Sequence, residues 1–192
     1  MPSNKTTFIP PFGVDFDIDA GTMPGATNHV VRKASVMRGY YADGAALARL
    51  IAEQGDPLHY EVFEKPVPED CGHLMFCLSK IQPGRVGEEC FMTKGHYHGT
   101  VEAAEVYLGL GGEGLVLMKT ADGRTGVERI ARGRMVYVPP FFAHRTVNTG
   151  TEPLAFFCVY AADAGHNYGD IEKEGFPMRV FQRGGRAVVE GA

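Results

Sequence analysis

The feature that most constrains the fold is a series of short β-forming runs in the middle of the chain, separated by Gly, Pro, Asn and Asp turns. The runs are LHYEVFEK (58–65), HLMFCLSKIQ (73–82), AEVYLGLGGEGLVLMKT (104–120), GVERIARGRMVYVPP (126–140) and EPLAFFCVYAA (152–162). Runs of this length and spacing are typical of an all-β sandwich or barrel. The glycine-rich part of the third run is interpreted as a bend between two strands, because no helix follows it.

The residues before these runs are predicted to add one short helix and one strand. Asp43 is placed to cap a helix that ends at Gln54, with apolar residues at helical spacing between them and Gly55 just beyond. HVVRKASVM (29–37) has the pattern of a strand. Residues 1–28, rich in Pro, Gly and Asp, are expected to form an irregular arm.

The domain organisation follows from length and continuity. A chain of 192 residues is long enough for one domain with a sizeable core and short for two. No repeat, low-complexity tract or linker divides it, so we predict a single domain over 1–192. Within it we expect an N-terminal arm and helix at 1–57, a β-barrel core at 58–170, and a tail at 171–192 that packs on the outside.

Composition excludes several classes of function. The 19 basic and 23 acidic residues give a net charge of −4, which disfavours a non-specific nucleic-acid binder. No apolar run approaches the roughly 18 residues of a membrane-spanning helix, so no membrane association is expected. The N-terminal stretch lacks the apolar segment of a signal peptide. The four cysteines form no CxxC pair, and we expect reduced thiols in a cytoplasmic protein.

A candidate metal site lies in TKGHYHGTVEAAEVY (93–107). In a strand, residues i and i+2 face the same side, so His96 and His98 point together, and a hairpin brings Glu105 back beside them. Two imidazoles and a carboxylate suit a divalent transition metal. His144 follows a Pro-Pro turn and is a fourth candidate for the same point. The alternative is that these are ordinary polar residues on strand faces.

Groups beside this cluster suit an anion such as phosphate. Thr93, Lys94 and the backbone N–H of Gly95 offer a hydroxyl, an ammonium and an unobstructed amide. Ser79 and Tyr160, in neighbouring β-forming runs, are expected to add hydroxyl donors. Thr93, Lys94 and Gly95 immediately precede His96, so one strand is predicted to hold both a metal and an anion.

The remaining histidines have different settings. His166 and Tyr168 lie in the glycine-containing segment DAGHNYGD, which is either a binding loop or a simple turn. His29, His59 and His73 lie in or beside strand-like runs, where we expect surface or structural roles.

The motifs around these residues resemble a known family. GEECFMTKGHYHGTVEAAEVYLGLGGEG (87–114) is similar to the first motif of the cupin superfamily, and RGRMVYVPPFFAHRTVNTG (132–150) to the second. TKGHYH, EVY, PPFFAHRTVNTG and VYAADAGHNYG together resemble the cupin-type glucose-6-phosphate isomerases. The resemblance implies a cupin fold (a small β-barrel or jelly roll), usually a homodimer, with one divalent metal per chain. Fe²⁺ is expected first, with Mn²⁺, Ni²⁺, Co²⁺ or Zn²⁺ as alternatives.

The resemblance also implies roles for individual residues. The implied metal ligands are His96, His98, Glu105 and His144. The implied phosphate contacts are Ser79, Thr93, Gly95 and Tyr160, and the implied neighbours of the sugar are Tyr107, His166 and Tyr168. Ser79 stands where a threonine is expected and keeps the hydroxyl.

The expected reaction interconverts glucose 6-phosphate and fructose 6-phosphate, in glycolysis or gluconeogenesis. A divalent cation would polarise the carbonyl and stabilise an enediolate, and Glu105 is the candidate base that moves the proton. A metal lowers the pKa of a bound carboxylate, so the Glu–metal bond would have to loosen when substrate binds. A metal-assisted hydride shift is the alternative and needs no base. Tyr160 or His166 is expected to assist ring opening or proton transfer.

Two other functions fit parts of the pattern. A non-haem iron dioxygenase on the same barrel would use such ligands to activate O₂, and activity without oxygen would exclude it. A non-catalytic sugar-phosphate-binding module would use the four ligands as a closed structural site. The hydroxyl and cationic groups near the metal favour a phosphorylated substrate and hence the isomerase.

Overall fold

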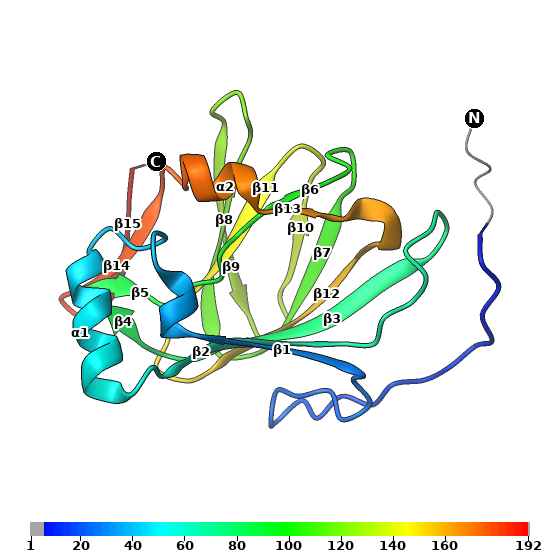
Figure 1. The fold of residues 1–192 in the computed structure, drawn as a ribbon, viewed down its shortest axis with the longest axis horizontal. Coiled ribbons are helices and arrows are strands. Elements are labelled where there is room, and N and C mark those ends of the chain that lie inside the picture. Colours follow the sequence, from blue (N-terminus) through cyan, green and yellow to red (C-terminus); the bar gives the residue numbers. More distant parts are fainter. Residues whose placement is uncertain (1–5, 192) are drawn as a thin grey trace.

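The computed structural model describes residues 6–191, in which β-strands predominate and surround a common interior (Figure 1). Residues 1–5 of the predicted arm and Ala192 of the predicted tail lie outside the described residues. Within the described part of the chain, no helix is long and apolar enough to cross a membrane.

Two antiparallel sheets form the barrel. The larger has the strand order β1 (Asn28–Lys33), β2 (Leu58–Glu64), β3 (Leu74–Ile81), β12 (Leu154–Ala161), β7 (Glu105–Gly111) and β10 (Met135–Val138). The smaller has the order β11 (Ala143–Asn148), β8 (Glu113–Lys119) and β9 (Thr125–Ala131). The two sheets face each other across the interior, and β9 contacts β7 and β10 at one side (Figure 1).

Smaller elements close the ends of the barrel. A four-stranded sheet has the order β15 (Arg186–Glu190), β14 (Arg179–Arg183), β5 (Glu89–Cys90) and β4 (Arg85–Val86), and a two-stranded ribbon joins β13 (His166–Asn167) to β6 (Tyr97–His98). The helical elements are η1 (Ala34–Met37), α1 (Gly44–Gln54), η2 (Ala162–Ala164) and α2 (Gly169–Glu174). Figure 1 shows α1 beside β4 and β5 at the lower left, and α2 near the top of the view.

The predicted helix is confirmed together with both of its end signals. The Asp43 carboxylate accepts a hydrogen bond of 2.8 Å from the Ala46 backbone N–H, which satisfies a donor that the first turn leaves free. Gly55 adopts a left-handed conformation with φ of +69°, and its N–H bonds to the carbonyl of Ile51. Ala46 and Leu47 are the buried residues of this helix.

Some predicted boundaries are wrong. The predicted strand at 29–37 ends at Lys33, and residues 34–37 form the short helix η1. The physical reason is a non-local contact, because the Asp56 carboxylate accepts from the backbone N–H and the hydroxyl of Ser35, both at 2.7 Å. The short helix α2 and the strands β14 and β15 were not predicted, and the two strands join the expected tail to β5 and β4 in one sheet.

The register of the large sheet decides which side chains reach the interior. Along β12, alternate residues are buried and face inward: Leu154, Phe156, Cys158 and Tyr160. Tyr160 lies directly opposite Glu105 on β7, and Cys158 lies between Cys77 on β3 and Tyr107 on β7. Because the side-chain period of a strand is two, these rows place polar groups of several strands on one inner face.

The N-terminal arm packs on the outer face of the large sheet. The ring of Phe16 meets that of Phe157 edge-on, with centroids 5.1 Å apart, and Phe12 lies 6.2 Å from Phe76. The arm thus covers apolar residues of β3 and β12 that point away from the interior.

Candidate metal centre and adjoining cavity

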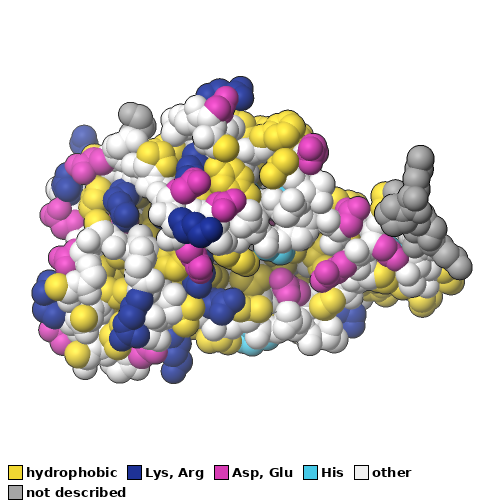
Figure 2. Space-filling view, turned by 45° about the horizontal axis from the view of Figure 1, so that its top comes forward, with side chains coloured by type: hydrophobic (Ala, Val, Ile, Leu, Met, Phe, Trp, Pro, Cys, Tyr) yellow, Lys and Arg dark blue, Asp and Glu magenta, His cyan; other side chains and the backbone are white. Residues whose placement is uncertain are grey.

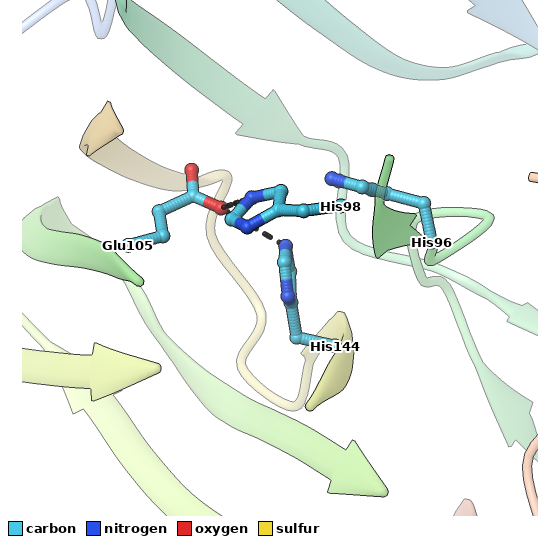
Figure 3. Close-up of side chains that lie close together, drawn as sticks. All are labelled: His96, His98, Glu105 and His144. Atoms are coloured by element: carbon cyan, nitrogen blue, oxygen red, sulfur yellow. Dashed lines mark ion pairs between the residues drawn. The ribbon is translucent and has the colours of Figure 1, made fainter. Parts of the chain in front are cut away.

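Three histidines and one glutamate converge inside the barrel (Figure 3). Their ligand atoms all lie within 4.8 Å of one another, in a group formed by His96, His98, Glu105 and His144. His98, Glu105 and His144 are 3%, 4% and 2% exposed, so the group is screened from bulk water. The side chains come from β6, β7 and β11 and from the segment just before β6.

Backbone pairing explains how residues distant in sequence reach one point. His96 and His144 form an antiparallel bridge, with N···O distances of 3.2 Å and 3.0 Å between their backbones. This bridge places His96, the first residue of the HxH segment, beside β11. The turn between His98 and Glu105 then leads into β7 of the large sheet. The predicted hairpin is wrong, because β6 pairs with β13 while β7 pairs with β10 and β12, but the turn still brings Glu105 beside the histidines.

Hydrogen bonds to backbone carbonyls orient two of the imidazoles. His98 Nδ1 lies 3.0 Å from the carbonyl of Ala103, and His144 Nδ1 lies 3.4 Å from that of Phe142. A carbonyl only accepts, so Nδ1 carries the proton and the Nε2 lone pair faces the centre. This is the tautomer that a metal ligand requires.

The centre holds polar atoms that the protein itself does not satisfy. Glu105 Oε2 lies 3.0 Å from His144 Nε2 and 3.3 Å from His98 Nε2. Neither contact has hydrogen-bond geometry, and Nε2 of His96 is also buried without a partner. Imidazole lone pairs and a carboxylate oxygen repel one another unless a cation lies between them. The donor set therefore fits a divalent transition metal, and it does not fit a closed hydrogen-bond network.

The charge states of these groups suit the same conclusion. Burial raises the pKa of Glu105, but His144 and His98, which can donate to it when protonated, outweigh burial, so the pKa lies below its ordinary value. Burial lowers the pKa of His98, but the contact with Glu105 outweighs burial and raises it. Burial, with the neighbouring imidazoles, holds the pKa of His96 well below its ordinary value. At neutral pH the group therefore offers a carboxylate and a neutral imidazole, as metal binding requires.

A cavity of about 190 Å³ adjoins the centre. Every predicted substrate contact lines it: Ser79, Thr93, Lys94, Gly95, Tyr107, Tyr160, His166 and Tyr168. Figure 2 shows the surface hollowed near the middle of one face, with histidine atoms visible beside the hollow.

The segment at 166–168 forms part of this lining. Strand β13 pairs with β6, which places His166 opposite His98. The ring centre of His96 lies 4.5 Å from that of His166 and 5.3 Å from that of Tyr168. Of the two interpretations of this segment, a wall of the cavity agrees with the structure, since a simple turn would not place both rings against a candidate ligand.

The segment at 93–95 is held from several sides. The Thr93 hydroxyl accepts from the backbone N–H of Thr146 at 3.1 Å, and the Lys94 carbonyl accepts two hydrogen bonds from Arg145, at 3.1 Å and 2.7 Å. Gly95 has a φ of +77°, and a Cβ there would lie 2.7 Å from the Phe176 ring. The glycine is therefore required both by its backbone conformation and by close approach.

Lys94 has a partner that the sequence did not reveal. Its Nζ lies 3.7 Å from Glu172 Oε1 on α2 and 5.0 Å from the centre of the Tyr40 ring. The Tyr40 hydroxyl donates to the same carboxylate at 2.8 Å. The ammonium predicted to face an anion is thus paired with a carboxylate of the chain.

Several residues that line the cavity were not predicted: Arg32, Tyr60, Glu64, Cys77, Thr146 and Cys158. One signal was available, because Thr146 follows His144 by two residues in a strand and so shares its face. Alternation along residues 58–64 groups Tyr60 with Glu64, but periodicity alone does not say which face of that strand is inside. Arg32 lies on β1, within the region assigned to the arm and helix.

Comparison with known proteins adds independent information. Residues 31–190 match the family model described as glucose-6-phosphate isomerase. The chain is 46% identical over 179 residues to the glucose-6-phosphate isomerase of Thermococcus gammatolerans, covering 93% of each chain. It is 44% identical over 180 residues to that of Thermococcus litoralis, covering 94% of each. Among solved structures, an oxalate oxidase aligns with 58% of this chain and 56% of its own, at 15% identity and a TM-score of 0.48.

Proposed function

The chain belongs to the cupin-type glucose-6-phosphate isomerase family, and from this premise we propose that it interconverts glucose 6-phosphate and fructose 6-phosphate in the cavity beside the metal centre. The observation that carries the proposal is the cluster of four buried, unsatisfied ligand atoms that opens onto a cavity lined by hydroxyl and amide groups. A small polar substrate is what such a lining recognises.

The residues proposed to hold the metal are His96, His98, Glu105 and His144. Fe²⁺ is the first candidate, and Mn²⁺, Ni²⁺, Co²⁺ and Zn²⁺ accept the same donors. When bound, such an ion would supply Lewis-acid polarisation of the substrate carbonyl. The protein contributes the fixed tautomers of two histidines and the exclusion of bulk water.

Glu105 is the proposed base. Isomerisation moves one hydrogen between C1 and C2, and a carboxylate beside both carbons would accept the C2 proton and return it to C1 through an enediol. Glu105 is the only carboxylate of the cluster, and its pKa below the ordinary value keeps it ionised. The alternative, a direct hydride shift between the two carbons, uses no base and predicts no exchange with solvent.

Tyr160 and His166 are proposed to assist ring opening and proton transfer. Tyr160 lies opposite Glu105 in the sheet, and its ring is stacked 5.8 Å from that of His98. Burial raises the pKa of Tyr160, so its hydroxyl stays protonated and acts as a donor. His166 meets the Tyr160 ring edge-on at 5.4 Å, so the two side chains lie beside each other.

The phosphate is proposed to bind at the other end of the cavity. The Thr93 oxygen already accepts from the backbone of Thr146, which leaves its hydroxyl hydrogen free to donate to a ligand. Ser79 offers a second hydroxyl from β3, and Gly95, which also lines the cavity, offers its backbone amide. Tyr107 and Tyr168 complete the lining near the sugar. These contacts would supply orientation, not chemistry.

The proposal is tested by measuring conversion of fructose 6-phosphate without oxygen. Purified, EDTA-stripped and metal-reconstituted protein are compared, and activity is expected to disappear with chelation and return with metal. Activity in the absence of O₂ would exclude the dioxygenase alternative. Conversion that is unaffected by chelation in a protein shown to be metal-free would overturn the metal requirement.

Glu105→Gln tests the base. Loss of general-base catalysis is expected to lower kcat by about 10²- to 10⁴-fold. The matched control is Glu102→Gln, an exposed acid in the same turn, which is expected to leave kcat unchanged. Metal content of each variant separates loss of the base from loss of the ion. Reaction in D₂O should incorporate deuterium at the transferred position. Absence of deuterium, with Glu105→Gln as active as Glu102→Gln, would favour the hydride shift.

Four further expectations accompany this function. We propose that the chain is one domain over 1–192 and that it assembles as a homodimer. A cytoplasmic location is expected from the cysteine pattern, and a place in glycolysis or gluconeogenesis from the family resemblance. Each remains a prediction.

A further inference from the structure

One cation that lines the cavity has no carboxylate partner. Arg32 lies on β1 and contributes to the cavity. Among residues 6–191, no carboxylate oxygen lies within ion-pair distance of its guanidinium. Figure 1 places β1 at the edge of the large sheet, alongside β2. An unpaired guanidinium beside a polar cavity is available to a ligand anion.

The other cations near the cavity are already engaged. Lys94 is paired with Glu172 and lies over the Tyr40 ring. Arg145 is 2% exposed, donates two hydrogen bonds to the Lys94 carbonyl, and lies 4.5 Å from the centre of the Phe176 ring. Glu172 therefore offsets the charge of Lys94, and Arg145 is buried and bonded to the Lys94 carbonyl, whereas Arg32 has no carboxylate partner among the described residues.

Sheet register places Arg32 among the groups proposed to bind phosphate. Arg32 lies directly opposite Tyr60 on β2, and the adjacent inward row contains Ser79. The charge of Arg32 also acts on Tyr60 and Tyr168. Burial raises the pKa of each phenol, and the positive charge of Arg32 opposes that rise. Arg32 thus lines the same cavity as Tyr60, Tyr168 and Ser79, and it lies one inward row of the sheet away from Ser79.

This position is at the opposite end of the cavity from the reacting groups. Residues that are paired across the strands form rows of the sheet. Tyr60 is paired with Ile81 at one end of β3, and Tyr160 is paired with Met75 near the other end. Glu105 also lies in the row of Tyr160. In a hexose 6-phosphate the phosphoryl group is at the far end of the carbon chain from C1 and C2. The two ends of the cavity thus match the two ends of the substrate.

We propose that Arg32 is the residue that neutralises the substrate phosphate and thereby selects phosphorylated sugars, while Lys94 stays in its ion pair with Glu172. This inference rests on the proposed function. A guanidinium binds a phosphate through two parallel N–H···O bonds, which an ammonium cannot reproduce. β1 therefore belongs to the substrate site although it precedes the barrel strands in sequence.

Arg32→Gln and Arg32→Lys test the inference. For Arg32→Gln, KM for fructose 6-phosphate is expected to rise about 10- to 100-fold with little change in kcat, because a charge-assisted contact is lost from both ground and transition states. Arg32→Lys should be intermediate, since it keeps the charge and loses the fork. Arg49→Gln is the matched control on the surface of α1 and should leave both constants unchanged.

Binding of inorganic phosphate, measured by calorimetry, separates this inference from the proposed function. Wild type is expected to bind phosphate, and Arg32→Gln to lose most of that affinity at unchanged metal content and melting temperature. If wild type shows no isomerase activity but phosphate binding still depends on Arg32, the proposed function fails and the anion site stands.

Two results would overturn the inference. One is phosphate binding and KM in both Arg32 variants equal to those of wild type. The other is a loss that appears in Lys94→Gln and exceeds that in Arg32→Gln, which would assign the phosphate to the lysine. Should Arg32→Gln fail to fold, Arg32→Lys supplies the same comparison with the charge retained.

Discussion

At the scale of single residues, burial determines what the histidines of this chain do. His59 is fully buried, its Nε2 lies 2.7 Å from the Tyr41 hydroxyl, and its ring lies 3.9 Å from that of Phe91. Burial lowers its pKa to about 3. His29, by contrast, lies at the surface, where it contacts Glu61. The structural or surface roles expected for these histidines agree with the structure.

The pKa of His59 predicts a loss of stability in acid. Its folded pKa of about 3 lies below the ordinary 6.5, so the unfolded chain binds more protons between these values. The free energy of unfolding should therefore fall as the pH is lowered from 6.5, by up to about 1.4 kcal/mol per pH unit from this group. His59→Phe removes the group and should flatten the dependence, as measured by urea unfolding at several pH values.

Tyr41→Phe serves as the control for this experiment. It removes the hydroxyl partner and keeps the titrating imidazole, so the pH dependence of wild type should persist. Parallel pH profiles for wild type and His59→Phe would contradict the assignment, whatever the absolute stability of the variant.

At the scale of elements, the segment at 93–95 shows that irregular backbone can be as rigidly placed as a strand. It is held by Thr146 and Arg145 on β11 and covered by Phe176, which follows α2. The same segment precedes a candidate metal ligand, so its position sets the distance between the anion end and the metal end of the cavity. Its rigidity therefore serves orientation of the substrate.

A pair of glycines separates backbone strain from close packing. Gly95 and Gly123 have φ of +77° and +89°, but a Cβ at Gly123 would meet nothing within 4 Å. Gly123→Ala should cost only about 1 kcal/mol of stability from the left-handed conformation. Gly95→Ala should cost a further 1–3 kcal/mol or so from overpacking, and should lower activity.

Urea unfolding and the isomerase assay measure the two effects. The stability difference between the variants reports the crowding of the added Cβ against Phe176, the His144 carbonyl and Arg145, since both glycines have positive φ. Equal losses of stability, with full activity in Gly95→Ala, would show that the segment moves aside and that its packing does not set the site.

At the scale of the whole molecule, one edge of the large sheet carries exposed apolar side chains. On β10, at the edge of the large sheet, Met135 is 66% and Tyr137 is 56% exposed, and Leu108 on β7 lies opposite Met135. The arm packs against β3 and β12, and β7 separates these strands from β10. Exposed apolar groups at a sheet edge mark a surface suited to a partner.

The expected homodimer should use this edge. Sedimentation of wild type should give twice the chain mass of 20.9 kDa, and the double substitution Met135→Asp with Tyr137→Asp should give monomers, because buried carboxylates would be unpaired. Val188→Asp, at a 36% exposed position on β15, is the control that should remain dimeric. A dimer that survives the double substitution would place the interface elsewhere.

Much of the candidate site could be predicted from the sequence. The spacing of His96 and His98 on a strand determines that they share a side, and the end signals at Asp43 and Gly55 determine the extent of α1. These inferences succeeded because they depend on local geometry, in which neighbours along the chain decide direction and period. The convergence of Glu105 followed from one short turn.

Only the tertiary structure decided which further side chains line the cavity beside the candidate metal ligands. Arg32 reaches the cavity because β1 pairs with β2 and β2 with β3, over separations that periodicity does not describe. The pairing of Lys94 with Glu172 likewise depends on where α2 rests. The two-residue period of side chains determines which residues share a face of a strand. Closure of the barrel determines which face is inside and which strands are neighbours. Closure depends on the whole chain, so local sequence does not reveal it.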